Sequence, residues 1–284
     1  MARFNKSQVK SKIRHIQNKY NQGMRKIERQ INHKINDYNR AVKRYNSNLR
    51  KNQSKIKSEL MKFQRNSTIR VSSSTYKISV INVNQSYDRL SQKYDFEDNS
   101  NRYRNFLEKI EEENANNLEV ANVILNNDEI NNEGYSLEEN IVSNKLLNIS
   151  EDLDNRWKGA IFSLNPKNPD ATRHFCTSTR EIFIQIIDTE AKDNDVIHAF
   201  PDCEKTNNGT VSRRSKIKYL LHKKGVNDID IENFVHTDIE NILSLLYELN
   251  GGTHGQAGKY SINQLKSIKK RVENGLNFLC EYVV

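Results

Sequence analysis

Residues 13–35 read IRHIQNKYNQGMRKIERQINHKI, and the spacing of their apolar side chains decides the architecture of the N-terminal part of the chain. The apolar residues follow one another in steps of three, four and four, at Ile13, Ile16, Tyr20, Met24, Ile27, Ile31 and Ile35. Such steps place side chains on one face of an α-helix, and a repeat of eleven residues is typical of a straight or slightly right-handed supercoil. The stretch therefore predicts a long helix with a single apolar stripe.

The stripe extends from Val9 to Phe63, and its second half changes to the heptad spacing of a left-handed coiled coil. The polar Asn52 occupies one stripe position, as is typical of a residue that fixes the register of a coiled coil. An isolated helix with so many charges does not recover its ordering entropy, so the stripe needs a partner. That partner is another copy of the chain, the following helix or a different protein.

The net charge of +9 is concentrated in an N-terminal arm, residues 1–66. This range carries 19 Lys and Arg against 3 Asp and Glu, a net charge of +16, whereas residues 88–155 carry 6 against 17, a net charge of −11. Unbalanced positive charge along a helix favours contact with the phosphate backbone of RNA or DNA. The alternatives are an acidic protein partner, including the acidic segment of this chain, and a solvated helix face. The arm residues expected to bind nucleic acid include Arg25, Lys26, Lys43 and Arg44.

The middle of the chain changes pattern twice. Apolar residues alternate with polar ones around a Ser/Thr-rich turn in residues 67–81, which predicts a short β-hairpin built on Ile69, Val71, Tyr76, Ile78 and Val80. A helical period returns from Tyr87 to Leu125 and is followed by an acidic, Asn-rich stretch without a period. The predicted organisation is a basic coiled-coil arm (1–66), a β-hairpin plus helical connector (67–125), an acidic linker (126–139) and a C-terminal helical domain (140–284).

The C-terminal domain contains repeated helix signals. A helix is expected around Trp157, and Asn168-Pro169-Asp170 predicts the start of another. A third is expected from about Thr210, and capping boxes predict two more that begin at Thr237 and Ser261. Helices joined by short loops form a bundle. The predicted fold class is therefore mainly α, with a long N-terminal coiled-coil helix, a short β-hairpin and a C-terminal helical bundle.

The helix that follows Pro169 supplies the first candidates for a functional site. It places Arg173, Thr177 and Arg180 on one face, with His174, Ser178 and Glu181 one step around it. We expect Arg173, Arg180 and Glu181 to take part in catalysis. The alternative is that these charges pair with residues of adjoining helices.

The second candidate is the loop at residues 250–258, where four glycines flank His254 between two helices. Glycine permits close approach of the backbone to a ligand, and histidine acts as a general acid or base near neutral pH. The alternative is a helix C-cap followed by a packing turn.

The third candidate is a basic turn that contains Arg213, Arg214, Lys216 and Lys218. Arginine and lysine form charge-assisted hydrogen bonds with phosphate, so this turn is expected to bind nucleic acid. The alternative is again a solvated helix face.

Cysteine usage and hydropathy limit the remaining classes of function. Cys176, Cys203 and Cys280 are far apart and odd in number, which indicates a reducing compartment and no disulfide framework. We find no metal-binding spacing, P-loop or dinucleotide-binding glycine motif, so neither a metal nor another cofactor is expected. The polar start of the sequence lacks the apolar segment of a secretory signal, and no run approaches the roughly 20 apolar residues of a membrane span. We therefore expect a cytoplasmic protein with no membrane partner.

Four motifs of the C-terminal domain carry a family resemblance. They are Arg-Trp-x-Gly-Ala (156–160), Asn-Pro-Asp-x-x-Arg-His-x-x-x-Ser-x-Arg-Glu (168–181), Thr-x-x-Arg-Arg-x-x-x-x-Tyr (210–219) and Thr-His-Gly-x-x-Gly (253–258). With these motifs the chain resembles the predicted pPIWI-associating nuclease family, a module of prokaryotic anti-phage defence loci, over residues 150–284. The arm resembles, more loosely, the basic coiled coil that often precedes this module. The resemblance implies a nuclease or toxin that works with other proteins of the same locus.

The helical bundle and the combination of arginine with histidine also resemble HEPN ribonucleases, in which an arginine closely precedes a histidine and RNA is cut without a metal ion. This resemblance implies metal-independent cleavage of RNA, with His254 as general acid and base. Arg173, Arg180 and Arg213 would stabilise the charge on the phosphorane. The sequence departs from the HEPN motif, because the residues five to seven positions before His254 include no arginine. Any arginine must therefore come from another helix.

The alternative function is that of a non-catalytic sensor or assembly protein. Its glycine-rich loop and arginine-bearing helix would then bind a nucleotide, a nucleic-acid end or a partner defence enzyme. With either function, we expect the arm to form homo-oligomers through its apolar stripe.

Overall fold

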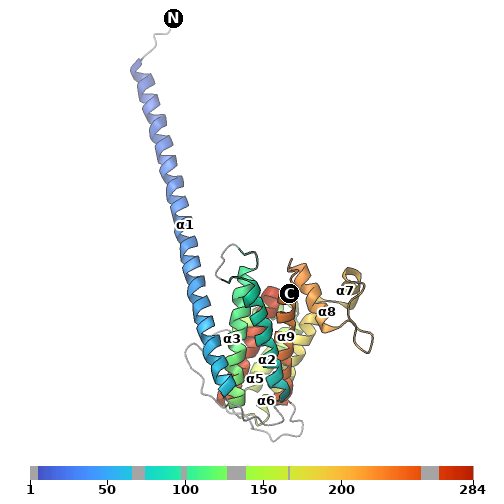
Figure 1. Ribbon diagram of the computed structural model, residues 1–284. Coiled ribbons are helices and arrows are strands. Elements are labelled where there is room, and N and C mark those ends of the chain that lie inside the picture. The colour runs from blue at the N-terminus through green and yellow to red at the C-terminus, as the bar shows by residue number, and fades with distance from the viewer. Residues whose placement is uncertain are drawn as a thin grey trace. The chain divides into compact units, whose positions relative to one another are not determined.

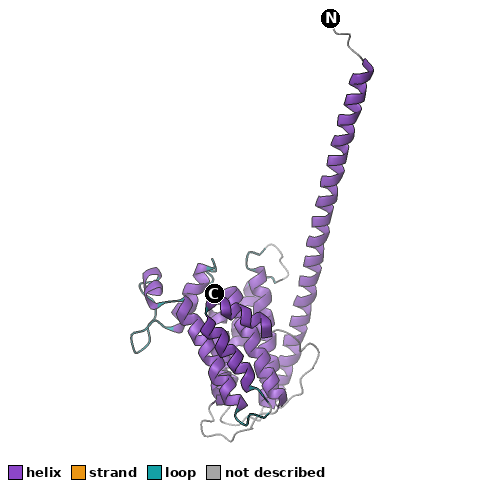
Figure 2. Cartoon of the chain, turned by 180° about the vertical axis from the view of Figure 1, so that it is seen from behind, coloured by secondary structure: helices purple, strands orange, loops and turns teal. Residues whose placement is uncertain are grey.

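The structure is a computed structural model that describes residues 6–65, 74–96, 101–126, 139–165, 167–250 and 262–283 (Figure 1). Within these ranges the chain forms the α-helices α1 to α10 and a C-terminal π-helix, η2, and Figure 2 shows no strand among them. Lys205 and Val211 form a single antiparallel bridge in the loop before α8. The mainly α fold class is therefore confirmed.

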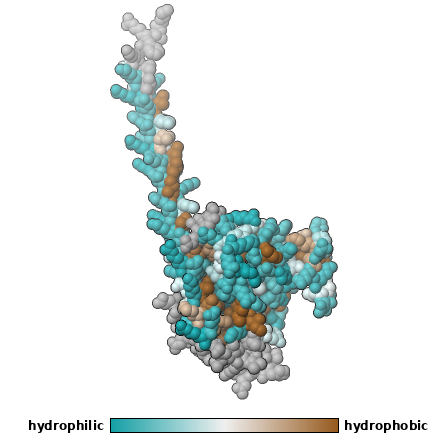
Figure 3. Space-filling model, viewed as in Figure 1, coloured by the Kyte–Doolittle hydropathy of each residue, from teal (hydrophilic) through white to brown (hydrophobic). Residues whose placement is uncertain are grey.

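Helix α1 (Lys6–Arg65) confirms the predicted long N-terminal helix, and its basic last turn complements the helix dipole. The chain divides into two compact units, Met1–Arg50 and Lys51–Val284. Between Ile16 and Tyr38 the apolar stripe is about half exposed or more, at Ile16, Tyr20, Met24, Ile27, Ile31, Ile35 and Tyr38, whereas Tyr45 and Leu49 of the same unit are buried. Figure 3 shows the stripe as a line of brown residues along the helix.

The predicted β-hairpin at residues 67–81 is wrong, because helix α2 (Ser74–Lys93) occupies its second half. The buried side chains of α2 follow a helical period, at Tyr76, Val80, Val83, Tyr87 and Leu90. Ile78 is 58% exposed. Tyr76 and Val80 are therefore buried positions one helical turn apart, and Ile78 between them is exposed. Together the three residues give the apolar alternation that suggested a strand. The first half of the predicted hairpin, with Ile69 and Val71, lies outside the described residues.

The helical pattern predicted from Tyr87 to Leu125 belongs to two helices. α2 ends at Lys93, and α3 (Arg104–Asn126) follows it. Asn101 marks the new start, because its side-chain oxygen accepts the backbone N–H of Tyr103 at 2.9 Å. The predicted acidic linker at 126–139 falls almost entirely outside the described ranges, which resume with α4 (Glu139–Ile149).

Within the unit Lys51–Val284, α2 is antiparallel to both α9 (Ile229–Asn250) and α3, and α3 is antiparallel to α10 (Ile262–Phe278). Successive contacts fix these directions: Ser79–Asn241 and Lys93–Asp228 for α2 with α9, Asn84–Asn114 and Tyr87–Glu111 for α2 with α3, and Phe106–Phe278 and Glu113–Arg271 for α3 with α10. It follows that α9 and α10 also run in opposite directions. The predicted connector helices thus pack against the last helices of the chain (Figure 1).

The other helices of this unit are α5 (Glu151–Ser163), α6 (Ala171–Glu190), α7 (Asp193–Ala199), α8 (Arg213–Lys223) and the π-helix η2 (Leu279–Val283). α6 begins directly after Asn168-Pro169-Asp170, as predicted. α8 begins a few residues after the predicted position. Its N-cap is Ser212, whose Oγ accepts the backbone N–H of Ser215 at 3.2 Å.

The predicted start of a helix at Thr237 is wrong, because α9 already begins at Ile229. The side chain of Asp228 caps this start and accepts the backbone N–H groups of Asp230 at 2.9 Å and Ile231 at 3.2 Å. Thr237 lies inside α9, where its hydroxyl donates to the backbone carbonyl of Asn233 at 2.8 Å. The Thr-x-x-Glu pattern at 237–240 is therefore an internal part of the helix. The start predicted at Ser261 lies outside the described residues.

Gly275 allows α6, α9 and α10 to approach one another closely. A Cβ atom at this position would overlap Ile242 of α9 and lie 3.2 Å from Phe183 of α6. Farther along α6, Glu190 lies close enough to Cys280, in η2 directly after α10, to add to the effect of burial in raising the pKa of its thiol. α6 therefore runs in the same direction as α10 and opposite to α9.

Candidate functional site

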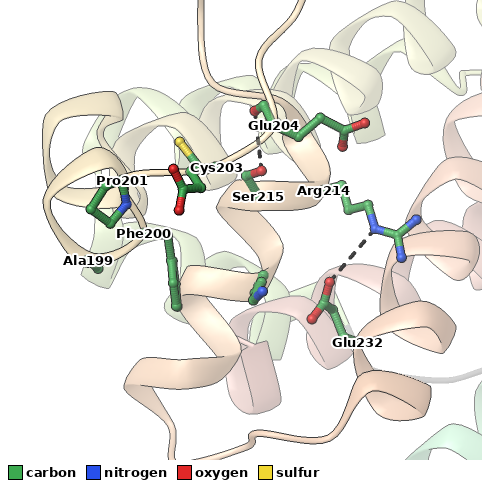
Figure 4. Close-up of a pocket in the computed structure, with 10 residues that line it drawn as sticks. Ala199, Phe200, Pro201, Cys203, Glu204, Arg214, Ser215 and Glu232 are labelled. Carbon is green, nitrogen blue, oxygen red and sulfur yellow. Dashed lines mark hydrogen bonds and ion pairs between the residues drawn. The ribbon is translucent and has the colours of Figure 1, made fainter.

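Helix α8 forms one wall of a pocket of about 410 Å³ (Figure 4). The segment between α7 and α8 forms the facing wall, with Phe200, Pro201 and Cys203. Ser215 connects the two walls, because its Oγ donates to the backbone carbonyl of Glu204 at 3.2 Å. The volume of this α8 pocket lies within the range of roughly 300–1,000 Å³ that is usual for small-molecule sites.

Two predicted nucleic-acid-binding residues, Arg214 and Lys218, line the α8 pocket. Arg214 donates from Nη2 to Asn233 Oδ1 at 2.6 Å, and its Nε lies 3.8 Å from Glu232 Oε1. Lys218 Nζ lies 5.1 Å from the centre of the Phe200 ring. Burial raises the pKa of Glu232, although the positive charges of Lys218 and Arg214 oppose this shift. The pocket therefore holds two cations beside an aromatic ring, together with the carboxylates of Asp202, Glu204 and Glu232.

The other two predicted residues of the basic turn, Arg213 and Lys216, do not line this pocket. Arg213 forms an ion pair with Glu240 of α9. Lys216 is only 11% exposed and lies 2.8 Å from Asp188 Oδ1 and 2.7 Å from Asp193 Oδ1. These contacts connect α8 to three neighbouring helices, so the predicted basic turn divides into ligand-facing and structural residues.

The predicted catalytic residues of α6 are already in contact with carboxylates. Arg173 is exposed and pairs with Asp170 at the start of the helix. Arg180 donates from Nη2 to Glu181 Oε1 at 2.9 Å, while its Nε is buried without an acceptor among the described residues. Arg173 and Arg180 are two helical turns apart, which corresponds to roughly 10 Å along the axis. The α6 face thus carries two separate cationic positions.

His254 lies outside the described residues, as does the whole stretch 251–261. The helices that flank this stretch nevertheless define one end of the bundle, where α9 ends at Asn250 and the described part of α10 begins at Ile262. Because α6 runs parallel to α10, its first half, with Arg173, lies toward the same end.

The predicted arm residues Arg25, Lys26, Lys43 and Arg44 are exposed on α1. They lie in the unit Met1–Arg50 and share a helix with the exposed apolar stripe. The surface of this helix is therefore open to both a polyanion and an apolar partner.

Sequence reasoning missed a cluster of fully buried charges. Arg271 of α10 is 0% exposed and pairs with Glu113 of α3 and Asp238 of α9. A signal for it exists in the sequence, since Arg271 falls beside Ile268 and Val272 on the apolar face of α10. Breaking a buried pair is costly, so these three residues hold α3, α9 and α10 in fixed positions.

Within the described ranges, no group of three or more His, Cys, Asp and Glu residues is arranged to hold a metal ion. In the same ranges, each helix is too short or too polar to cross a bilayer.

Comparison with protein families identifies one relationship. Residues 146–279 match the family model described as "Predicted pPIWI-associating nuclease". This range contains α6, α8 and all residues that line the α8 pocket, and it excludes the arm. Comparison with curated proteins and with solved structures gives no match. The family resemblance predicted for the C-terminal domain is therefore confirmed over these residues.

Proposed function

Because residues 146–279 match a predicted nuclease family, we propose that the chain is the nuclease effector of a prokaryotic anti-phage defence system. The observation that carries the proposal is the α8 pocket within the matched residues, which Arg214 and Lys218 line and where Lys218 lies over the ring of Phe200. Cations that neutralise phosphates and rings that stack on bases are the two elements of sequence-tolerant binding to single-stranded nucleic acid.

The substrate that we propose is RNA, because its 2′-hydroxyl supplies a nucleophile and no metal-bound water is then required. The 2′-oxygen attacks phosphorus while His254 accepts its proton, and the bond to the 5′-oxygen breaks as that oxygen takes the proton back from His254. Arg173 and Arg180 would stabilise the added negative charge, and Glu181 would orient Arg180. The location of Arg173 toward the end of the bundle where α9 ends supports this assignment.

The arm would bind nucleic acid by charge alone, through exposed residues such as Arg25, Lys26, Lys43 and Arg44. It would also join copies of the chain, because its stripe of about half-exposed apolar residues needs a partner. We place this effector in the cytoplasm, with other proteins of the same locus as its partners.

One observation favours the alternative of a non-catalytic sensor or assembly protein. Arg173 and Arg180 are each paired with a carboxylate, so their charges are already balanced in the described structure. A site of this kind binds a nucleic-acid end or a partner enzyme without the unpaired cation that transition-state stabilisation requires.

The test uses the full chain, single-stranded RNA and DNA of the same sequence, and two histidine variants. His254→Ala should lower the rate of RNA cleavage by roughly 10²–10⁴-fold, the usual contribution of a general acid or base. His198→Ala, an exposed histidine of α7, is the matched control and should cleave at the wild-type rate. Equal cleavage by both variants would remove His254 from the reaction. Intact RNA together with equal RNA affinity of wild type and His254→Ala would favour the sensor.

A further inference from the structure

A second pocket, of about 190 Å³, lies between α3, α4, α10 and η2 and shares no lining residue with the α8 pocket. Its volume is below the roughly 300–1,000 Å³ that drug-sized ligands occupy. It therefore suits a single planar ring system better than a whole nucleotide or a cofactor.

The carboxyl group of Glu113 lines this second pocket and is held rigidly. Its side chain is 3% exposed, and its Oε2 accepts a hydrogen bond from Arg271, which Asp238 holds from the other side. The hydrogen bond from Arg271 uses Oε2, so Oε1 takes no part in it. Glu113 is thus a preorganised acceptor whose position does not depend on a ligand.

Asn277 of α10 supplies a second acceptor in the same lining. Its Oδ1 is buried, and no donor reaches it from the described part of the chain. A buried acceptor without a donor is costly, and such atoms in native proteins call for a partner. Glu113 and Asn277 together indicate a ligand that brings N–H donors.

The lysines at the rim are already neutralised. Lys109 Nζ lies 2.6 Å from Glu112 Oε2, and Lys145 Nζ lies 2.7 Å from Glu281 Oε2. Because each lysine has a carboxylate partner, neither lysine is available to pair with a phosphate. The second pocket therefore differs in chemistry from a phosphate site.

An aromatic wall completes the lining. The rings of Phe278 and Tyr282 stack with centroids 6.0 Å apart at an angle of 26°, and Phe106 packs edge-on against both. Tyr282 belongs to the π-helix η2, a rare conformation that occurs frequently at functional sites. Aromatic rings beside fixed acceptors are the arrangement that holds an unstacked base of single-stranded RNA.

We propose that this pocket binds one unpaired guanine base, whose Watson–Crick edge donates to the carboxylate of Glu113 and to Oδ1 of Asn277. Guanine presents two adjacent donors on that edge, N1–H and the exocyclic N2 amine. Adenine and cytosine place one amine beside an acceptor, and uracil has a single N–H between two carbonyls. The proposal rests on the proposed function in one respect, namely that the natural ligand is a nucleic acid.

The test measures binding of the four ribonucleoside 5′-monophosphates to the full chain by calorimetry. Wild type should bind the guanine nucleotide at least about tenfold more tightly than the other three, as expected when base-specific hydrogen bonds discriminate. Ile141→Trp should abolish this preference, because Ile141 lines the pocket and is 50% exposed, so a larger ring blocks the entrance without entering the core. Leu147→Trp is the matched control on the same helix, 51% exposed and not in the lining, and should bind as wild type does.

Glu113→Gln adds a second measurement that does not depend on the steric block. The amide has only one acceptor oxygen, so it cannot accept from both Arg271 and the base, and the preference for guanine should fall. Circular dichroism follows the folded fraction of the variant. Equal affinities for the four nucleotides in wild type, or a guanine preference that survives in Ile141→Trp, would overturn the proposal. Cleavage of RNA together with equal binding of the four nucleotides would refute the proposed guanine site and leave the proposed nuclease function intact. Guanine-selective binding without cleavage of RNA would support the proposed guanine site and refute the proposed nuclease function.

Discussion

At the scale of single residues, neighbouring cations of α8 have different roles. Arg214 and Lys218 line the α8 pocket, whereas Lys216 is buried between Asp188 and Asp193. We predict that Arg214→Ala combined with Lys218→Ala weakens binding of single-stranded RNA roughly tenfold, or about 1.4 kcal/mol, in fluorescence anisotropy. The melting temperature should stay unchanged, because both side chains contact solvent.

Lys216→Ala is the matched variant for this experiment. It removes two ion pairs that join α8 to α6 and α7, so it should lower the melting temperature by a few degrees while the folded protein keeps its affinity for RNA. If Lys216→Ala weakened RNA binding as much as the double variant did, the division of roles along α8 would be wrong.

A second prediction concerns Glu111, which is fully buried beside Tyr87. Burial raises the pKa of its carboxyl from 4.5 to about 7, although hydrogen bonds from Tyr87 and Gln53 oppose the shift. Because the folded-state pKa lies above the unfolded value, the neutral acid stabilises the fold below about pH 4.5. That contribution is lost as the pH rises through about 7.

Glu111→Gln keeps the shape of the side chain and is neutral at every pH, so the variant should not lose stability as the pH rises through about 7. At pH 8 the variant should have a free energy of unfolding about 1–3 kcal/mol above that of wild type, and at pH 4 the difference should vanish. Urea denaturation at both pH values measures it. A difference that is the same at pH 4 and pH 8 would refute the titration of Glu111.

Much of the residue-level site could not be read from the sequence. The basic turn was predicted as one group, and only the packing of α8 against α6, α7 and α9 separates Arg214 and Lys218 from Arg213 and Lys216. The Arg271 cluster depends on three helices that are far apart in sequence, and the second pocket depends on the same contacts. His254 stays a prediction, since its loop lies outside the described residues.

At the scale of elements, Gly275 tests the junction of α6, α9 and α10. Gly275→Ala should destabilise the protein by about 1–3 kcal/mol, because the new methyl group overlaps Ile242 in a packed core. Gly159→Ala is the control inside α5, where nothing lies within 4 Å of the added Cβ, and should stabilise by about 0.5–1 kcal/mol. Thermal unfolding of both variants measures the contrast, and destabilisation by neither would contradict the close packing at Gly275.

The elements also show where period and turn signals mislead. α1 was predictable because its apolar stripe is long and its apolar side chains lie on one face of the helix. In α2 the alternation of Tyr76, Ile78 and Val80 imitated a strand over a few residues, and only tertiary burial reveals the helical period. At Thr237 a capping pattern lies inside a helix. The residue that caps α9 is Asp228, and no capping box marks it because Ile231, three residues later, is not Glu or Gln.

At the scale of the whole molecule, the boundary between the two units gives the arm a defined end. Residues 51–65 of α1 belong to the larger unit, where Lys55 Nζ lies 2.8 Å from Glu119 and Asn122 donates to Glu59 at 2.8 Å. Deletion of residues 1–50 should therefore destabilise the protein less than deletion of residues 1–66, because it removes the buried Tyr45 and Leu49 but keeps the buried Ile56 and Phe63.

Deletion of residues 1–50 should also remove oligomers and most of the affinity for duplex nucleic acid. If the arm engages six to ten phosphates, the slope of log K against log salt should be roughly −5 to −9 for the full chain and much smaller after the deletion. Sedimentation and salt titrations measure the two effects. An unchanged salt slope would move the principal nucleic-acid surface from the arm to α8.

The central claim is metal-independent cleavage of RNA, and the chemistry of the product ends tests it most directly. Wild-type protein is incubated with single-stranded RNA in excess EDTA, and the products are identified by mass spectrometry. Attack by the 2′-oxygen predicts fragments with 2′,3′-cyclic phosphate and 5′-hydroxyl ends, and none from a substrate with 2′-deoxy sugars. Fragments with 3′-hydroxyl and 5′-phosphate ends that form only when a divalent metal is added would contradict the account.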